Sequence, residues 1–192
     1  MPPITLLVLI IIGLVGNQNP LQNFLNVFLW VWFWVGLSFY SIFFGSLWQK
    51  INPWNLGYIL LISKAVNNKK PYKSTFNLGW IGVVLLFIHL WIANIYLGRE
   101  IPIFLSIYLI LYTMITWSGM YFFGRKQWLK SAEIFHVIFG LLSKLSILNK
   151  KNINELIKGY VPTSNFKIFN GHISGSIFIF LMLAGIVFDG VL

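Results

Sequence analysis

The sequence predicts an all-α fold, a polytopic membrane bundle of about five transmembrane helices with one cytoplasmic amphipathic helix. Hydrophobic residues make up 58% of the 192 residues and charged residues only 9%, whereas roughly 25% of residues are charged in a soluble domain. Long uncharged runs alternate with short basic loops. A soluble domain of this size could not bury so much apolar surface, so the composition excludes soluble, disordered and fibrous classes.

Five apolar segments are the predicted spans, because a helix needs about 20 apolar residues to cross a bilayer. Four of them approach or exceed this length: 24–48, 78–97, 101–123 and 173–192. The fifth, 4–15, gives only about 18 Å of helix, so flanking residues must help it to cross. A further run, 56–63, is too short to cross and is predicted to lie at the interface.

Segment 128–148 is predicted to be an amphipathic helix. At 100° per residue, Lys130, Glu133, His136 and Lys144 fall on one side, and Leu, Ile, Val and Phe residues fall on the other. Such a helix either lies flat in the interface or crosses with its polar stripe facing the bundle.

The basic residues favour the first arrangement. If 128–148 does not cross, 13 of the 14 Lys and Arg residues share one side of the membrane and Arg99 stands alone on the other. If it crosses, the split is 8 to 6. The positive-inside rule therefore predicts a cytoplasmic N-terminus, a cytoplasmic loop at 149–172 and an extracytoplasmic C-terminus in the inner membrane. Aromatic residues expected to anchor the cytoplasmic interface are Trp48, Trp54, Tyr58, Tyr72, Trp80, Tyr121 and Trp128.

The net charge of +10 is interpreted in the same way. Basic loops on the cytoplasmic side bind anionic lipid, so we expect the bilayer as partner and no nucleic acid. The chain has no Cys, which excludes disulfides, thiolate metal sites and iron–sulfur clusters. We predict no metal and no cofactor. Both ends are abrupt, so residues 1–192 are predicted to form one transmembrane domain of a longer protein that also contacts a membrane partner subunit.

The candidates for catalysis are Glu133, His136, His89 and Asp189. Glu133 and His136 have the i, i+3 spacing of di-iron bundles, but such sites need two copies and further carboxylates. The alternative is a polar stripe in which Glu133 pairs with Lys130. His89, near the middle of its span, is either a functional ionisable group or a hydrogen-bonding group between helices.

A polar group is predicted on the extracytoplasmic side. Its members are Asn17, Asn19, Arg99, Glu100 and Asp189. The connection at 98–100 is so short that the spans around it must be antiparallel neighbours. These side chains either converge on an outward-facing polar pocket or are ordinary loop ends, with Asp189 near headgroup depth.

Several short motifs occur in a familiar order. They are Gly-Asn-Gln-Asn-Pro at 16–20, Val-Trp-Phe-Trp-Val-Gly at 31–36, Gly-Ser-Leu-Trp at 45–48, Ile-Asn-Pro-Trp at 51–54, Gly-Met-Tyr-Phe-Phe-Gly-Arg at 119–125, Trp-Leu at 128–129, Glu-Ile-Phe at 133–135, Phe-Gly at 139–140 and Phe-Asp-Gly at 188–190. In this order they resemble a family of bacterial integral-membrane proteins often labelled fenitrothion hydrolase. The resemblance runs over nearly the whole chain and implies a longer protein. It supplies no catalytic residues.

The sequence therefore predicts an integral inner-membrane protein without a demonstrable catalytic motif. One alternative is a membrane-bound hydrolase of the organophosphate type, completed by a missing region or a partner subunit. Another is a transporter or permease component. That function needs a polar path through the bilayer, and the uncharged runs argue against a wide one.

Overall fold

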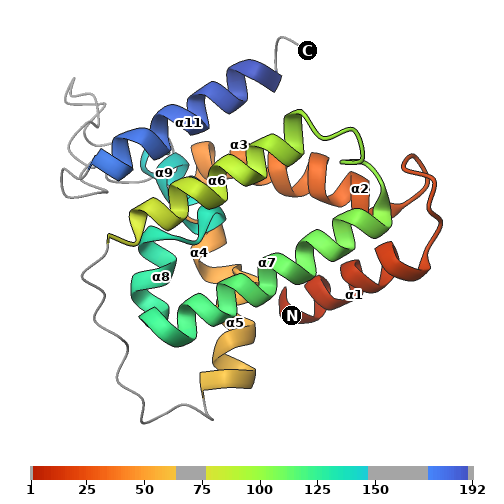
Figure 1. Ribbon diagram of the computed structural model, residues 1–192, viewed down its shortest axis with the longest axis horizontal. Coiled ribbons are helices and arrows are strands. Elements are labelled where there is room, and N and C mark those ends of the chain that lie inside the picture. The colour runs from red at the N-terminus through yellow and green to blue at the C-terminus, as the bar shows by residue number, and fades with distance from the viewer. Residues whose placement is uncertain (1, 64–76, 147–172, 190–192) are drawn as a thin grey trace.

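The computed structural model describes residues 2–63, 77–146 and 173–189, and every regular element in these ranges is helical (Figure 1). The all-α prediction is confirmed for this part of the chain. The elements are α1 (Pro2–Val15), α2 (Phe24–Val27), a π-helical stretch (Phe28–Gly36), α3 (Leu37–Phe44), α4 (Leu47–Ile51), α5 (Pro53–Tyr58), a second π-helical stretch (Ile59–Ser63), α6 (Gly79–Asn94), α7 (Pro102–Phe123), α8 (Arg125–Ser131), α9 (Ile134–Lys144) and α11 (Ile173–Asp189). The predicted loop at 149–172 lies outside the described residues.

Two described helices are long and apolar enough to cross a bilayer. One is the continuous helix Phe24–Phe44 of 21 residues, formed by α2, the first π-helical stretch and α3, and the other is α7 with 22 residues. Helices α1, α6 and α11 are apolar but have 14, 16 and 17 residues, fewer than the 20 or so that a span usually needs. Length and composition thus support two spans, and the larger number stays a prediction.

The described helices pack largely in pairs. Helix α11 lies beside α6, α1 lies beside α7, and α9 packs against α3 (Figure 1). Glycines permit the first pairing, since a Cβ on Gly79 would lie 2.6 Å from Ser174 Oγ and one on Gly185 would lie 2.5 Å from Leu90 Cδ2. Small residues at these positions let two apolar helices approach closely.

Segment 128–148 is not the single helix that the sequence predicts. Helix α8 ends at Ser131, and Glu133 has an extended backbone (φ −74°, ψ 105°) at the N-cap of α9. Its carboxylate accepts the backbone N–H groups of Phe135 and His136, which satisfies the first turn of α9 but requires a non-helical residue there. The break also removes Glu133 from the predicted polar stripe, because its side chain is fully buried. Helix α9 itself is amphipathic.

Four of the predicted interface anchors lie in the core instead. Trp48, Trp54, Tyr58 and Trp128 are between 2% and 6% exposed. The indole of Trp128 packs directly on Gly119, where a Cβ would collide with the ring. The prediction of an aromatic belt is therefore wrong for these four residues. Trp80 is 38% exposed, and Tyr72 lies outside the described residues.

The molecule places apolar side chains outside and several polar ones inside. Exposed apolar residues on the long helices include Val35, Ile88, Leu111 and Phe180, the last 71% exposed. Polar residues that are at least nine-tenths buried are Asn23, Asn26, Ser41, Asn52, His89, Ser106, Thr116, Glu133, Ser146 and Ser174. A soluble protein rarely exposes so many large apolar side chains on its helices while burying polar ones, so this distribution suits an apolar solvent.

Candidate functional site

A cavity of about 450 Å³ lies between α1, the Phe24–Phe44 helix, α4, α5, α6, α7 and α9. Its walls are mostly aliphatic and aromatic, and His89 and Tyr108 are its most polar lining groups besides Thr5. Cavities that bind small molecules commonly measure 300–1,000 Å³ and combine apolar walls with a few polar groups. The cavity is the candidate site.

Aromatic contacts fix the cavity wall. The first π-helical stretch supplies Phe33, whose ring meets Phe135 of α9 edge-on at 4.8 Å and Trp48 of α4 at 5.1 Å. Trp54 stacks on the same Phe135 ring at 5.7 Å between centroids. Edge-to-face and stacked arrangements at these separations are favourable. The wall is therefore an interlocked set of rings contributed by helices that are distant in sequence.

His89 on α6 and Tyr108 on α7 form the first buried polar centre. The Nδ1 atom of His89 lies 2.7 Å from the Tyr108 hydroxyl, so the two helices are joined by a hydrogen bond. The imidazole is 6% exposed and lies 5.1 Å from the Phe135 ring. Its Nε2 atom is buried without a hydrogen-bond partner. His89 thus makes the predicted interhelical bond and also lines the cavity.

Glu133 forms the second buried polar centre. Its Oε1 accepts the Tyr112 hydroxyl at 2.7 Å, and its Oε2 accepts Asn52 Nδ2 at 3.0 Å. The backbone N–H groups of Phe135 and His136 complete the set at 3.2 and 2.7 Å. Asn52 caps α5 and Tyr112 lies on α7, so this carboxylate ties three helices together. Its described partners do not include the predicted Lys130, which is exposed.

Burial controls the titration of the Glu133 carboxyl, which lies between α8 and α9 and outside the predicted spans, whereas its partner Tyr112 lies within α7. Desolvation raises the pKa of Glu133 from 4.5 to about 7, and the hydrogen bonds from Tyr112, His136 and Asn52 oppose that rise. Burial lowers the pKa of His136 from 6.5 to about 4. The imidazole Nδ1 of His136 is buried without a partner, and Glu133 contacts the backbone of His136.

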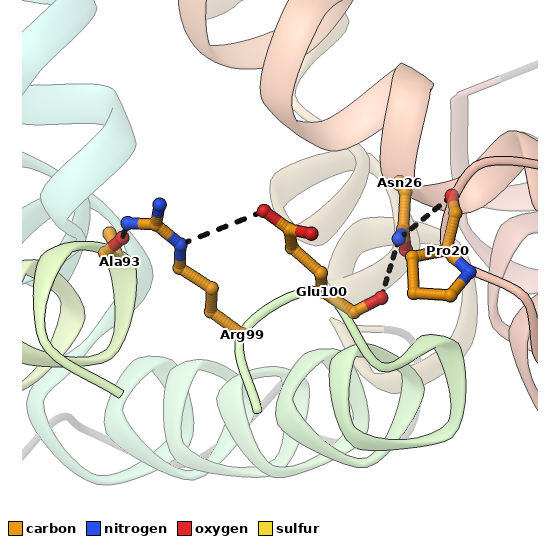
Figure 2. A network of polar contacts seen from close by, with 5 residues as sticks. All are labelled: Pro20, Asn26, Ala93, Arg99 and Glu100. Carbon is orange, nitrogen blue, oxygen red and sulfur yellow. Dashed lines mark hydrogen bonds and ion pairs between the residues drawn. The ribbon is translucent and has the colours of Figure 1, made fainter. Parts of the chain in front are cut away.

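The predicted extracytoplasmic group comes together only in part. Asn26 donates to the backbone oxygens of Pro20 and Glu100, which ties the 16–23 loop to the α6–α7 connection (Figure 2). Arg99 Nε lies 3.9 Å from Glu100 Oε1, and both side chains are more than one-third exposed. Figure 2 shows the Arg99 guanidinium directed toward Ala93, whose carbonyl it bonds at 2.6 Å.

The remaining members of that group serve local turns or lie outside the description. Asn17 Oδ1 accepts the backbone N–H of Asn19, and Asn19 Oδ1 accepts that of Leu21. These are the hydrogen bonds of Asx turns. Asp189 ends α11, and its side chain lies outside the described residues. In the described part of the chain, no three His, Asp or Glu side chains are close enough to hold a metal ion.

Sequence reasoning missed Tyr108, Tyr112 and Asn52. The signal for the tyrosines was their i, i+4 spacing in an otherwise apolar helix, continued by Thr116, which places hydroxyls along one face of α7. Asn52 was noted only as part of the Ile-Asn-Pro-Trp motif at 51–54. Its amide cap on α5 and its bond to Glu133 require the fold to be known.

Comparison of the chain with protein-family models, curated proteins and solved structures finds no match. The resemblance to the family labelled fenitrothion hydrolase therefore stays a prediction.

Proposed function

We propose that this chain is an integral membrane protein whose helical bundle binds an apolar small molecule in the cavity beside His89. The observation that carries the proposal is a 450 Å³ cavity with aromatic walls inside a bundle with an apolar exterior. A molecule that partitions into the bilayer can enter such a cavity without a change of medium, and packing against the aromatic walls then favours binding.

Membrane residence is supported by the two long apolar helices and by the exposed apolar faces of α6 and α11. We propose that the shorter helices α1, α6 and α11 also cross, which gives five spans with a cytoplasmic N-terminus. A reporter fused after Lys151 is then cytoplasmic, and one fused after Arg99 is extracytoplasmic. The reverse result at either position would overturn this topology.

Ligand binding is tested with decylbenzene, an apolar probe without hydrogen-bonding groups, added to the detergent-solubilised full chain. A ligand that binds only the folded state raises the unfolding temperature Tm roughly with the logarithm of its concentration once that concentration exceeds Kd. We expect this logarithmic rise for the wild-type protein. A rise that only follows the amount of probe in the micelle would contradict the proposal.

Two substitutions on α7 separate the cavity from the lipid-facing surface. Leu109 lines the cavity and is 3% exposed, whereas Leu111 is 53% exposed. We expect Leu109→Trp to fill the cavity and abolish the shift, and Leu111→Trp to retain it. Leu9→Phe, on the α1 wall, is a smaller cavity-filling change if Leu109→Trp does not fold. Equal behaviour of the filled and the surface variants would place the probe outside the cavity.

A further inference from the structure

Some hydrogen-bonding groups along the cavity wall have no partner within the described chain. Three cavity-lining residues have a buried ring nitrogen without a partner: Trp30, Trp48 and His89. An indole Nε1 can only donate. A buried donor left unsatisfied destabilises the folded chain, and a ligand that supplies an acceptor recovers part of that loss.

The contact between His89 and Tyr108 shows whether His89 Nε2 is a hydrogen-bond donor or an acceptor. The Tyr108 hydroxyl has no other hydrogen-bond partner among the described residues, so it satisfies its proton by donating to His89 Nδ1. A neutral imidazole that accepts at Nδ1 carries its proton on Nε2. The opposite tautomer would leave the tyrosine proton without an acceptor. His89 Nε2 is therefore a third donor.

We propose that the ligand is an apolar molecule with a carbonyl oxygen, which accepts a hydrogen bond from His89 Nε2. This inference rests on the proposed function and adds the chemical class of the ligand. A ring carbonyl, as in a quinone, and an acyl ester, as in a lipid chain, share this chemistry. The rings of Trp34 and Phe135, 5.2 and 5.1 Å from the imidazole, favour a flat ring beside the carbonyl.

The test compares two ring probes that differ in the acceptor, and adds an acyclic ester. Decylbenzoquinone has the decyl chain and six-membered ring of decylbenzene together with two carbonyl oxygens, and methyl dodecanoate represents the acyl ester. Because one neutral hydrogen bond contributes about 0.5–1.5 kcal/mol, decylbenzoquinone should bind the wild-type protein about 2- to 12-fold more tightly than decylbenzene. Tighter binding of the ester than of the quinone would assign the carbonyl to a lipid chain.

Histidine variants locate the hydrogen bond. His89→Phe should lose the preference for the quinone over decylbenzene, whereas His89→Gln, which retains an N–H donor, should keep part of it. His136→Phe is the matched control, because His136 also has a buried unpaired ring nitrogen but does not line the cavity. That variant should keep the full preference.

The outcomes separate the two proposals. If decylbenzene does not bind saturably, the proposed function fails. If decylbenzene and decylbenzoquinone bind the wild-type protein equally, or if His89→Phe keeps the preference, the cavity binds apolar molecules but the carbonyl inference is overturned. The comparison of probes on the wild-type protein gives an answer even if His89→Phe does not fold.

Discussion

The two buried polar centres both border the ring of Phe135 yet differ in how their hydrogen bonds are satisfied. Phe135 lies 5.1 Å from His89 and 5.3 Å from Tyr112, the partner of Glu133. The Glu133 carboxylate accepts four hydrogen bonds. The His89 imidazole makes one and leaves Nε2 unpaired.

This difference distinguishes a group that holds the fold from one that is available to a ligand. A buried polar group with all its bonds made within the chain stabilises one arrangement of helices. A buried donor without a partner, on the wall of a cavity, can gain a bond only from what enters. Burial alone would have made Glu133 and His89 equivalent candidates.

The largest expected effect is the loss of the Glu133 carboxylate. Glu133→Ala leaves the Tyr112 hydroxyl, the Asn52 amide and two backbone N–H groups without an acceptor, and we expect it to lower the free energy of unfolding by about 3 kcal/mol or more. Glu100→Ala is the control, because that side chain is 58% exposed and should cost little. Thermal unfolding in detergent measures both. Equal stability of the two variants would show that the Glu133 centre does not hold the helices.

The pH dependence of stability should reveal the same carboxyl. Its pKa is about 7 in the folded chain and 4.5 normally, so between these values the folded state binds more protons. The contribution of the Glu133 carboxyl to stability is therefore fully present below pH 4.5 and is lost as the pH rises to about 7. The free energy of unfolding should fall by on the order of 3 kcal/mol over this range.

His136 acts in the opposite direction. Its pKa of about 4 in the folded chain, against 6.5, makes stability rise with pH between these two values. His136 is present in both the wild type and Glu133→Gln, so its contribution cancels when the stability of the variant is subtracted from that of the wild type. The remaining difference reports Glu133 and should fall from pH 4.5 to 7. Urea unfolding across this range measures it, and a flat difference would contradict the expectation.

Removing one hydroxyl from each centre compares them directly. Tyr112→Phe leaves a buried carboxylate with one bond fewer and should cost about 1.5–3 kcal/mol, because hydrogen bonds to charged groups are strong. Tyr108→Phe removes a bond between neutral groups and should cost about 1 kcal/mol or less. Paired unfolding curves measure both. A larger loss for Tyr108→Phe would reverse the assignment of the two centres.

The smallest expected effect is at the loop that joins α6 and α7. Arg99→Gln removes an exposed contact to Glu100 at 3.9 Å and one bond to a carbonyl. Exposed ion pairs typically contribute less than about 1 kcal/mol. We expect a change of Tm close to the error of the measurement, and a loss comparable to that of Glu133→Ala would show that this loop organises the bundle.

Local patterns predicted the helices better than they predicted the partners. Continuous apolar runs placed Pro102–Phe123 and Phe24–Phe44 within a few residues, because helix length and apolar composition are local properties. The break before α9 was missed because Glu133 was assigned to the polar side of a helix rather than to its cap. Trp54 and Trp128 were assigned to the interface because composition does not show that Phe135 and Gly119 lie against them.

The candidate site, like the fold, was predictable only in part. His89 stood out because an imidazole inside a span is rare. Its partner Tyr108 lies on another helix, and the cavity is formed by segments as distant as α1 and α9. No spacing along the chain encodes that arrangement.

The π-helical stretch Phe28–Gly36 has a consequence for insertions and deletions. Its backbone bonds join residues five apart, one more than in an α-helix, so the stretch accommodates an additional residue without breaking the ladder. Deleting one residue here, for example Val31, lets the ladder return to α-helical bonding while α2 and α3 keep their relative facing. The same deletion in α7 would rotate every later side chain of the helix by about 100°. The π-helical stretch, which contributes Phe33 to the aromatic wall of the cavity, is therefore the part of the two long helices that best tolerates the loss of one residue.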